Sequence, residues 1–432
     1  MRPCAFDCIV VEGADQLLAF TFPGQGSQRH GMGSSWVDHP SFELVEQASE
    51  AVGRDVAHLL LGMDQESLTS TENAQLATFV LSLVILDATE RLGITPTMCA
   101  GHSLGEYSAL VASGALSFDD GVRLVNERGL AMKDAATKSS GTMMAILGLD
   151  DDSAEAACMR AEGDVWIANF NAPGQIVIAG APDDLLRAAE IAKELGAKRV
   201  MSFPVGGAFH TPYMAPARDL LRKALAGVSF REPDPPVVAN VDARIHEDPD
   251  EWPGLLSAQL CSPVRWHQSL QTLYESGVRT FVELGAGAVL TGLVKRSISQ
   301  GITALNVATP EELEALVDVI AGTEAASVRE LERTAGFVMT ERLIVAPATG
   351  PFRPASDLIE AAPTLSRAAA TRGVISLGVG DLVGWAGEIE IRSPFAGELQ
   401  GIIVLAGERV VTGQPVAWLR TTQESAMSIK ES

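Results

Sequence analysis

The sequence predicts an α/β fold with two additions, and three observations support this prediction. Between about residues 17 and 306, short β-like runs alternate with amphipathic helical stretches, as a sheet covered by helices requires. Within that region, residues 139–206 follow the order β-α-β-β-α-β, which is typical of a ferredoxin-like subdomain. Beyond residue 341 the helical stretches end, and β-like runs separated by glycine turns predict a small all-β domain.

The core sheet is expected to use four short apolar runs, namely 18-LAFTF-22, 97-TMCAG-101, 236-PVVAN-240 and 280-TFVEL-284. Two longer stretches, 74–93 and 104–116, carry apolar residues at helical spacing and are predicted helices. The core therefore comprises residues 18–138 and 207–308, on either side of the insertion. Residues 1–17 are expected to form an N-terminal arm.

The insertion is expected to contain four strands and two helices. The strands are 142–149, 165–170, 175–180 and 198–205, and the helices are 151–162 and 182–196.

A charged helical linker is predicted over residues 309–341, with Thr309 as its N-cap and Pro310 in the first helical position. Residues 342–420 then contain two similar phrases, 344-IVAPATGPFRP-354 and 391-IRSPFAGELQG-401. A glycine-rich phrase follows each of them. This repeat predicts two quasi-equivalent halves of a small barrel-sandwich-like β domain, followed by a tail over residues 421–432.

Composition excludes several classes of protein. The chain has 432 residues and a formal charge of −23, which disfavours nucleic acid as a partner because phosphate binding needs a basic surface. No window approaches 18 uninterrupted apolar residues, and the N-terminus lacks a cleavage-site pattern, so no membrane association and a cytoplasmic location are expected. The five cysteines lack paired C-x-x-C spacing, so neither disulfides nor a metal site is expected.

The stretch 101-GHSLG-105 matches the G-x-S-x-G pattern of a nucleophile elbow. Glycines on both sides of Ser103 allow a sharp turn from strand to helix that leaves the hydroxyl exposed. Such matches are common by chance, and a serine also needs a base to take its proton. Of the seven histidines, His210 in 203-FPVGGAFHTPYM-214 is the candidate, because it follows a β-like run and two glycines.

Two further features converge on an anionic substrate. The turn 22-FPGQGSQ-28 would present free backbone N–H groups at the carboxyl edge of the sheet, where an oxyanion can be held, although an ordinary β-turn is the alternative. Arg128 lies in an otherwise apolar helical stretch, and its planar guanidinium matches a carboxylate. A structural ion pair is the alternative role for this arginine.

Taken together, the motifs resemble those of the malonyl-CoA:acyl-carrier-protein transacylases, the acyltransferases of fatty acid and polyketide synthesis. The resemblance covers about residues 18–308. It rests on 23-PGQGSQ, 101-GHSLGEYSAL, 123-RLVNERG, 169-NFNAPGQIVIAG, 206-GGAFHTPYM, 236-PVVANVD, 259-QLCSPVRW and 283-ELGAGAVLTGL. The family implies an α/β-hydrolase-like core with an inserted ferredoxin-like subdomain.

The resemblance also implies roles for individual residues. Ser103 would be the nucleophile and His210 its general acid and base, with the backbone carbonyl of Gln259 orienting the histidine. Gln25 and Leu104 would donate the oxyanion-hole amides. Gln259 would also contact substrate, as would the remaining positions: Arg128, Phe209, Gln75, Asn169 and Asn240. The chain departs from the family where Leu76 takes the place of a proline, and only a local effect is expected.

The implied reaction is ping-pong transfer. Ser103 would take the malonyl group from malonyl-CoA as an ester, and the phosphopantetheine thiol of an acyl carrier protein would then collect it. A guanidinium at Arg128 would favour malonyl over acetyl groups, and the ring of Phe209 could exclude an α-methyl branch. No covalently bound cofactor is expected.

Residues 342–420 resemble a biotinyl/lipoyl attachment domain, but one that is degenerate. Such domains attach their cofactor to a lysine in a hairpin midway between the halves, and 383-VGWAGEIEIRSP-394 contains none. Lys430 is the single lysine after residue 341. We therefore expect neither biotin nor lipoate and a role in docking, oligomerisation or core stability.

Three alternative functions remain open at this point. The same serine–histidine pair would serve an editing hydrolase that clears acyl groups from carrier proteins, or the malonyl transferase component of a malonate decarboxylase. A non-catalytic scaffold is the third. The sequence also leaves open the pathway, the carrier protein and the oligomeric state, and offers basic residues for carrier docking at Lys193, Lys198, Arg199, Lys295 and Arg296.

Overall fold

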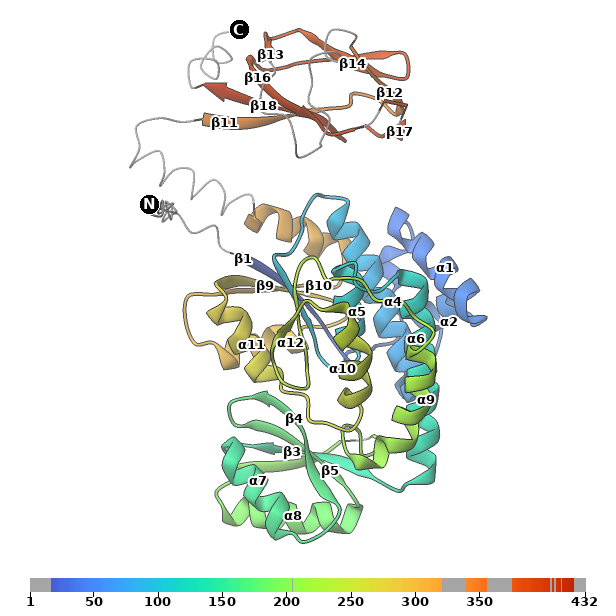
Figure 1. Cartoon of the computed structure of the whole chain (residues 1–432), viewed down its shortest axis with the longest axis vertical. Helices are drawn as coiled ribbons and strands as arrows, with labels where there is room; N and C mark the ends of the chain where they lie inside the picture. The colour runs from blue at the N-terminus through green and yellow to red at the C-terminus, as the bar shows by residue number, and fades with distance from the viewer. Residues whose placement is uncertain are drawn as a thin grey trace, which may run out of the picture. The chain divides into compact units, whose positions relative to one another are not determined.

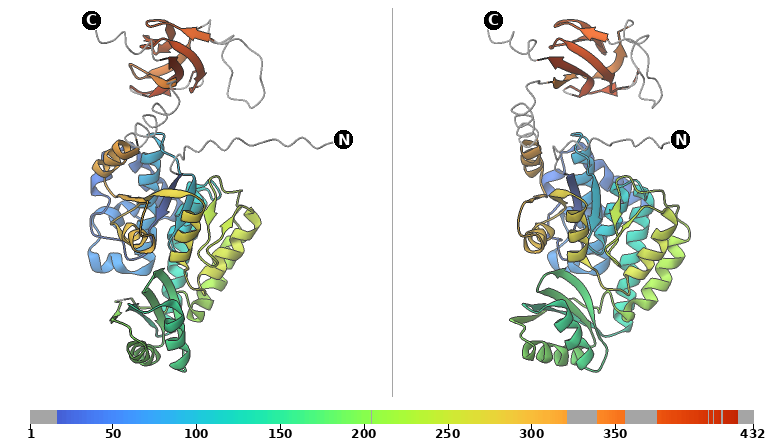
Figure 2. Two further views of the ribbon diagram at one scale, coloured as in Figure 1. Left: turned by 90° about the vertical axis from the view of Figure 1, so that its left-hand side faces the viewer. Right: turned by 60° about the vertical axis from the view of Figure 1, so that its left-hand side comes forward.

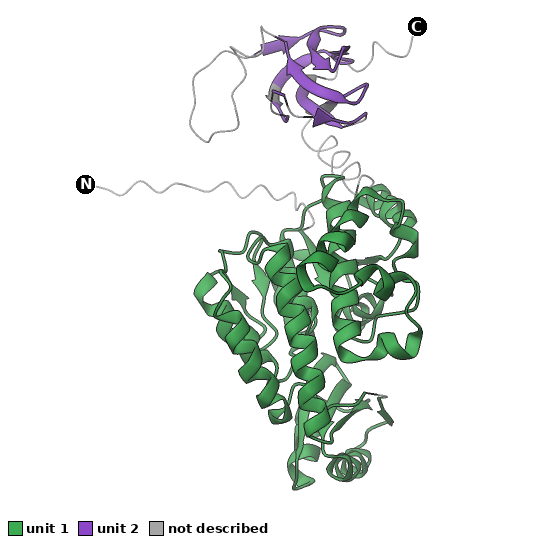
Figure 3. Cartoon of the chain, turned by 90° about the vertical axis from the view of Figure 1, so that its right-hand side faces the viewer, with its two compact units in different colours: residues 1–321 green, residues 322–432 purple. Residues whose placement is uncertain are grey.

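The computed structural model describes residues 17–203, 205–320, 339–355, 375–404, 406–407, 409–412 and 414–422. The chain divides into two compact units, residues 1–321 and 322–432, which are called unit 1 and unit 2 (Figure 3). Apart from Leu17, Thr421 and Thr422, the predicted N-terminal arm and C-terminal tail lie outside the described residues.

A six-stranded sheet forms the centre of unit 1, in the order β10-β9-β1-β2-β7-β8 (Figure 1). Its strands are β1 (Leu17–Phe22), β2 (Met98–Gly101), β7 (Val237–Val238), β8 (Ile245–His246), β9 (Val278–Leu284) and β10 (Thr303–Val307). All neighbouring strands are parallel except β7 and β8. The predicted α/β core is therefore present, with its strands drawn from both sides of the insertion.

Helices cover both faces of this sheet because successive side chains of a strand point to opposite faces. Phe20 and Phe22 of β1 pack into one apolar core, to which α4 (Thr71–Glu90), α5 (Gly105–Ala112) and α6 (Phe118–Lys138) contribute. Ala19, which directly precedes Phe20, packs into a second core with α11 (Trp266–Glu275) and α12 (Val289–Ser297). The first core is completed by α1 (Glu43–Val52), α2 (Val56–Leu61), α3 (Gln65–Thr69), α9 (Ala215–Leu225) and α10 (Trp252–Gln259).

The insertion forms a four-stranded sheet with two helices at one end of unit 1 (Figures 1 and 2). Its elements are β3 (Thr142–Leu147), α7 (Asp151–Arg160), β4 (Val165–Ala172), β5 (Gln175–Gly180), α8 (Pro182–Glu194) and β6 (Arg199–Ser202). The order in the sheet is β4-β5-β3-β6, and all three pairs are antiparallel. It has its own apolar core, so it packs as a separate layer of unit 1.

The first part of the predicted linker belongs to the core instead. Residues 310–320 are helical, and Thr309 caps them by accepting a hydrogen bond from Glu312 N–H at 3.3 Å, as the sequence predicts. However, Leu313 and Leu316 are buried in the main core of unit 1. This helix is therefore an integral element of unit 1, because burying its apolar face is more favourable than leaving it exposed.

Unit 2 contains two four-stranded sheets, β11-β18-β16-β13 and β15-β14-β12-β17. The strands are β11 (Met339–Val345), β12 (Gly350–Pro354), β13 (Ile375–Leu377), β14 (Leu382–Ala386), β15 (Ile389–Arg392), β16 (Gly397–Ile402), β17 (Arg409–Val410) and β18 (Pro415–Thr422). Exchanging the first four strands with the last four, in chain order, converts one sheet into the other. This exchange relation agrees with the two repeated phrases of the sequence.

Several bounds differ from the expected ones by one to a few residues. One such difference is the strand expected over residues 236–240, which contains only Val237 and Val238 in the structure. Asn240 instead turns into the site described below. Within the described residues, no helix combines the length and apolar character needed to cross a membrane.

Candidate active site

The carboxyl ends of β1 and β2 lie side by side and determine where the site forms. The two strands are parallel, with Phe22 opposite Gly101, so the turns that follow them leave the sheet at the same edge. A hydrogen bond of 2.9 Å from His102 N–H to Phe22 O connects these turns. In open α/β sheets, ligands bind in the crevice at this edge.

Ser103 occupies a strained turn between β2 and α5. Its φ is 53°, in the left-handed region that residues with side chains rarely adopt. The flanking glycines are required by space, because a Cβ on Gly101 would lie 1.9 Å from backbone atoms of Gly105. A Cβ on Gly105 would lie 2.0 Å from the Phe22 carbonyl oxygen. The predicted nucleophile elbow is therefore present as a backbone geometry.

Ser103 and His210 form a hydrogen-bonded pair. The distance from Ser103 Oγ to His210 Nε2 is 2.8 Å, and His210 Nδ1 lies 2.9 Å from the backbone oxygen of Gln259. Because a carbonyl oxygen can only accept, Nδ1 carries the proton and Nε2 is free to accept from the serine hydroxyl. Burial, followed by the nearby charge of Arg128, lowers the pKa of His210 to about 3, so the imidazole is neutral near pH 7.

Arg128 is buried beside the serine and is surrounded by neutral partners. Its side chain is 1% exposed, and it donates to Gln75 Oε1 at 2.5 Å, to Gln259 Oε1 at 2.8 Å and to Ser103 Oγ at 3.1 Å. Its guanidinium also lies 5.5 Å from the ring centre of Tyr107. In the part of the chain that the structure describes, no carboxylate forms a salt bridge with it. Burial lowers the pKa of Arg128, which shows that its charge is poorly solvated.

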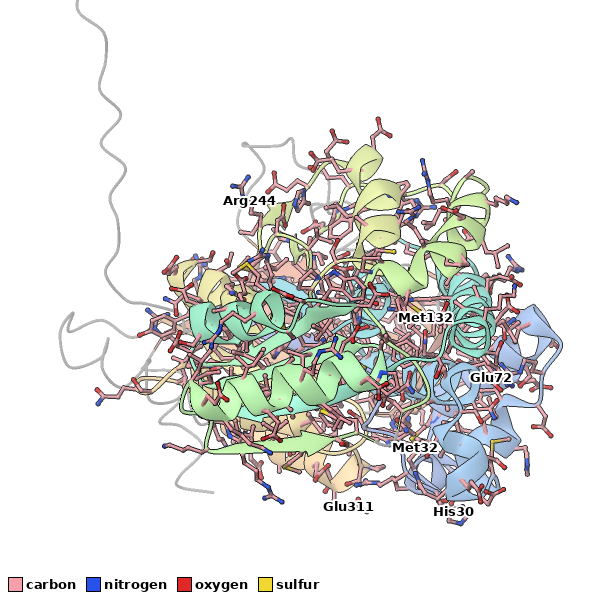
Figure 4. The ribbon with its side chains drawn as sticks, turned by 90° about the horizontal axis from the view of Figure 1, so that it is seen from below. His30, Met32, Glu72, Met132, Arg244 and Glu311 are labelled. Carbon is pink, nitrogen blue, oxygen red and sulfur yellow. The ribbon has the colours of Figure 1, made fainter. Side chains whose placement is uncertain are left out.

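The helix pair that carries Arg128 and Gln75 is fastened at a second point. Gln75 belongs to α4 and Arg128 to α6, and Gln75 Nε2 lies 3.2 Å from Met132 Sδ. One turn before Gln75, Glu72 accepts a hydrogen bond of 2.5 Å from Lys133 Nζ of α6. Glu72 and Met132 can be located in Figure 4. These contacts fix the spacing of the two helices and thereby the reach of the guanidinium.

Behind the serine, three buried side chains form a hydrogen-bonded support. Asn240 Oδ1 accepts from Ser103 N–H at 2.7 Å, and its Nδ2 donates to Gly101 O at 2.7 Å. Gln259 Nε2 donates to Ser103 O at 2.8 Å and to Glu106 Oε2 at 2.6 Å. Glu106 Oε1 accepts from Asn240 N–H at 2.6 Å. The nucleophile is therefore held through both its backbone N–H and its backbone carbonyl.

A cavity of about 500 Å³ opens in front of this arrangement. Its lining comes from the β1 turn, the elbow, α6, α12 and the insertion. Among the predicted site residues, it includes Gln25, Gln75, Ser103, Leu104, Arg128, Asn169, Phe209 and His210. Its remaining wall is largely apolar and includes Met132, Met143, Val177, Phe203, Val205, Leu290 and Leu293.

Two predicted substrate contacts lie elsewhere. Asn240 is fully buried and Gln259 is 1% exposed, and neither lines the cavity. Their polar groups are occupied by Ser103, Glu106 and other protein atoms, so both side chains support the site from behind. Gln259 nevertheless has the backbone contact to His210 that the resemblance implies.

Sequence reasoning missed Glu106 and Asn171. Glu106 is a fully buried carboxyl near the start of the largely apolar stretch 104-LGEYSALVASGAL-116, and that mismatch is a signal that could have identified it. Asn171 lines the cavity, and its Oδ1 lies within hydrogen-bond distance of His102 Nε2, at 2.8 Å. Asn171 lies within the motif 169-NFNAPGQIVIAG, but its role depends on a contact between the insertion and the elbow that the motif does not reveal.

Comparisons with known proteins agree with this geometry. The model of the acyl transferase domain family matches residues 19–337. The chain is 41% identical over 308 residues to the malonyl CoA-acyl carrier protein transacylase of Bacillus subtilis, covering 70% of this chain and 97% of the relative. For the Escherichia coli protein of the same name, the identity is 41% over 309 residues, which cover 70% of this chain and 99% of the relative.

Solved structures give the same result. An acyl carrier protein S-malonyltransferase from Vibrio cholerae superposes with a TM-score of 0.67 at 39% identity, covering 69% of this chain and 99% of the other. A malonyl-transacylase in complex with a type II PKS acyl-carrier protein superposes with a TM-score of 0.68 at 37% identity. The match covers 70% of this chain and 99% of the other. The fold and the match to the family define the class of the chain, which is that of the acyltransferases. The chain belongs to the family of malonyl CoA-acyl carrier protein transacylases.

Proposed function

We propose that the chain transfers a malonyl group from malonyl-CoA, through an ester on Ser103, to the phosphopantetheine thiol of an acyl carrier protein. One observation supports the substrate class above the others. Arg128 is a buried cation without a carboxylate partner among the described residues, and its Nη2 lies 3.1 Å from Ser103 Oγ. A buried unpaired charge is costly, and a substrate carboxylate next to the reacting carbonyl would compensate it.

In the first half-reaction, His210 Nε2 takes the proton of the Ser103 hydroxyl while the oxygen attacks the malonyl thioester. The amides of Gln25 and Leu104 would stabilise the tetrahedral oxyanion. When the intermediate collapses, the C–S bond breaks and coenzyme A leaves with the proton from His210. Gln259 O keeps the imidazole in the required tautomer, so no carboxylate is needed as third member.

In the second half-reaction, the thiol of the carrier protein gives its proton to His210 and attacks the Ser103 ester. Collapse of that intermediate breaks the C–O bond and returns the proton to Ser103. The malonyl group has then moved from one thioester to another, and the enzyme is unchanged. Such double displacement gives ping-pong kinetics.

Selection within the cavity would come from a few side chains. Gln75 holds Arg128 in place for the malonyl carboxylate, and an acetyl group would leave this guanidinium unpaired. Phe209 and Asn169 line the same cavity, where the ring of Phe209 would oppose an α-methyl branch. Strict malonyl over methylmalonyl selection therefore stays a prediction.

Partners and pathway follow the relatives in part. The related proteins are named for malonyl-CoA and acyl carrier protein, and one of them is seen with a type II polyketide carrier protein. Fatty acid and polyketide synthesis both use this reaction, and the choice between them stays open. The cytoplasmic location expected from the sequence also stays a prediction.

We further propose that the insertion is a ferredoxin-like subdomain and that residues 342–420 form a degenerate biotinyl/lipoyl-like domain. The antiparallel order β4-β5-β3-β6 supports the first assignment. For the second, the hairpin between β14 and β15 carries Gly387 and Glu388 where a carrier would have its lysine. A module of this kind without cofactor would serve docking, oligomerisation or stability.

Intact mass spectrometry tests the proposed function. Incubation with malonyl-CoA should add one malonyl mass to the chain, and Ser103→Ala should remove the adduct. Adding phosphopantetheinylated carrier protein should then move the label to the carrier. No adduct on the unaltered chain would favour a scaffold, and release of free malonate as fast as coenzyme A, with carrier present, would favour an editing hydrolase.

A further inference from the structure

Glu106 is the one buried carboxyl in the support behind Ser103, and the reaction scheme above assigns it no part. Its side chain is 0% exposed, and each of its two oxygens accepts one short hydrogen bond, from Asn240 N–H and from Gln259 Nε2, both at 2.6 Å. Buried carboxylates are costly unless such partners compensate them. A carboxyl at this place therefore needs a reason beyond packing.

The reason lies in the orientation of the Gln259 side-chain amide. An amide has one accepting oxygen and one donating nitrogen, and Arg128 needs the oxygen. Glu106 can only accept when it is ionised, so it requires the nitrogen of Gln259 to face it. Gln259 Oε1 is thereby directed to Arg128 Nη2, at 2.8 Å. The carboxylate therefore acts together with Ser103 O, which also accepts a hydrogen bond from Nε2, in setting the orientation of the amide.

Through Gln259 and Asn240, Glu106 is connected to the proposed nucleophile, to its base and to the substrate arginine. Gln259 also contacts Ser103 O and, with its backbone oxygen, His210 Nδ1. Asn240 contacts Ser103 N–H. We propose that ionised Glu106 is the positioning residue that holds the serine, the histidine and the substrate arginine in their reactive arrangement. This inference rests on the proposed function.

The protonation of Glu106 makes this role dependent on pH. Burial raises the pKa of Glu106 to about 7, while the hydrogen bonds from Asn240 and Gln259 and the charge of Arg128 lower it and Asp242 raises it. Tyr107, the other titratable group coupled to it, stays protonated because burial raises its pKa. Above about pH 7 the carboxylate accepts both hydrogen bonds. Below that pH its proton would point at a donor, and the support would loosen.

The acid limb of the pH profile should therefore report Glu106. Burial lowers the pKa of His210 to about 3, so protonation of the base cannot limit the rate near neutral pH. For the unaltered chain, kcat/KM for the first half-reaction, followed as coenzyme A release, should fall about tenfold per unit as pH drops below about 7. A profile that stays flat down to about pH 4 would overturn the proposal.

Glu106→Gln tests the amide argument directly. The variant keeps the shape but places a donor against Asn240 N–H or Gln259 Nε2, so the rate of coenzyme A release should fall roughly 100-fold, as a misplaced reacting group does. The acid limb should disappear. Glu283→Gln is the matched control, because Glu283 is equally buried and accepts from Thr291 N–H and Oγ1 away from the serine. This control should keep the rate and the pH profile.

A double-variant cycle separates positioning from general stability. Gln259→Leu keeps the backbone carbonyl that orients His210 but removes the amide. If Glu106 acts through that amide, Glu106→Gln should lower the rate of Gln259→Leu by less than about threefold, although it lowers the rate of the unaltered chain about 100-fold. Additive losses, or an unchanged rate in Glu106→Gln, would overturn the proposal. If that variant does not fold, the pH profile of the unaltered chain decides.

The proposed function fails in a different way. It fails if the unaltered chain forms no malonyl adduct at any pH, whereas the role of Glu106 fails if the adduct forms with a rate that is indifferent to Glu106 and to pH between about 5 and 8.

Discussion

Arg128 is held inside the protein by neutral acceptors, which leaves its charge available to a ligand. Gln75 and Gln259 keep the guanidinium fixed from two sides, and Tyr107 lies against it. A preorganised cation of this kind loses little conformational freedom when a carboxylate arrives, since its position is already set. The discrimination between malonyl and acetyl groups is therefore predicted to reside mainly in this residue.

Replacing Arg128 by alanine should reverse that discrimination. Hydrogen bonds to charged groups contribute about 1.5–3 kcal/mol, so kcat/KM for malonyl-CoA should fall roughly 10- to 150-fold. The value for acetyl-CoA should stay the same or rise, because no guanidinium would then be left unpaired. Coenzyme A release with each substrate measures both values.

Arg279→Ala provides a control for the arginine variant. Arg279 lies over the Tyr274 ring at 4.0 Å and donates to backbone carbonyls outside the cavity. Its removal should leave the ratio of malonyl to acetyl transfer unchanged. An unchanged ratio in Arg128→Ala as well would contradict the role given to the buried arginine.

At this scale, motifs of the sequence pointed to most of the predicted residues that line the cavity and, behind it, to Asn240 and Gln259 but not to Glu106. Ser103, His210 and Arg128 lie within recognisable motifs, and the structure brings them together. Glu106 acts across contacts to Asn240 and Gln259, which are 134 and 153 positions away in the chain. Such pairings depend on how distant segments pack, which local spacing does not encode.

The elbow between β2 and α5 is the element on which the site depends most. It brings a backbone carbonyl of β1, the end of β2 and the start of α5 so close together that two of its residues cannot carry a Cβ. The strain at Ser103 is stored there because the surrounding hydrogen bonds over-determine the turn.

Gly105→Ala should therefore damage both stability and activity. The added methyl would lie 2.0 Å from the Phe22 carbonyl oxygen, and backbone cannot move aside cheaply. We expect the free energy of unfolding to fall by about 1–3 kcal/mol, and the folded fraction to form the malonyl adduct roughly 100-fold more slowly. Denaturant unfolding and timed mass spectrometry measure the two effects.

Gly254→Ala is the matched substitution for this experiment. Gly254 lies in α10, and a Cβ there would meet nothing within 4 Å. Alanine is the better helix former by up to about 1 kcal/mol, so this variant should be equally or more stable. Equal behaviour of the two variants would show that the close approach at the elbow is not a constraint.

The elements themselves were predictable where apolar periodicity was strong. The strands β1 and β9 and the helices α4 and α5 lie within a few residues of their expected bounds. The strand predicted over residues 236–240 was too long because the apolar composition continues to Ala239, beyond the end of β7, before Asn240 turns towards Gly101. Residues 310–320 were predicted to be part of a linker because of their many charged residues, although Leu313 and Leu316 pack in the core.

At the scale of the molecule, all the proposed chemistry lies in unit 1. Every residue that lines the cavity precedes residue 321, and the match to the Bacillus subtilis relative covers 97% of that protein but only 70% of this chain. The extra length of this chain is thus additional to the transacylase. Each unit also has its own apolar core.

A chain that ends at Ala321 should therefore keep the first half-reaction. Its rate of coenzyme A release from malonyl-CoA should stay within about twofold of the full chain, because the residues that line the cavity belong to unit 1 and changes at independent sites rarely couple. Stopped-flow release assays compare the two chains. A loss of more than tenfold in a folded truncated chain would show that unit 2 contributes to the site.

The fold of the whole molecule was predictable in order but not in assembly. The alternation of elements, the inserted subdomain and the repeated C-terminal phrases can all be read from residue patterns. How β1 comes to lie between β9 and β2 cannot, because those neighbours are separated by most of unit 1 in the chain. The resemblance to a known family implied the type of core and did not state the order of its strands.

The exchange relation between the two sheets of unit 2 makes the two halves of the repeat depend on each other. Each half of the repeat supplies two strands to each sheet, so neither half alone can complete either one. Two copies of one half, paired as a symmetric dimer, would have the same strand order, and the hairpin at Gly387 and Glu388 connects the two halves here. Cutting that hairpin would leave two interlocked fragments, each of which needs the strands of the other to complete its hydrogen-bonded sheets.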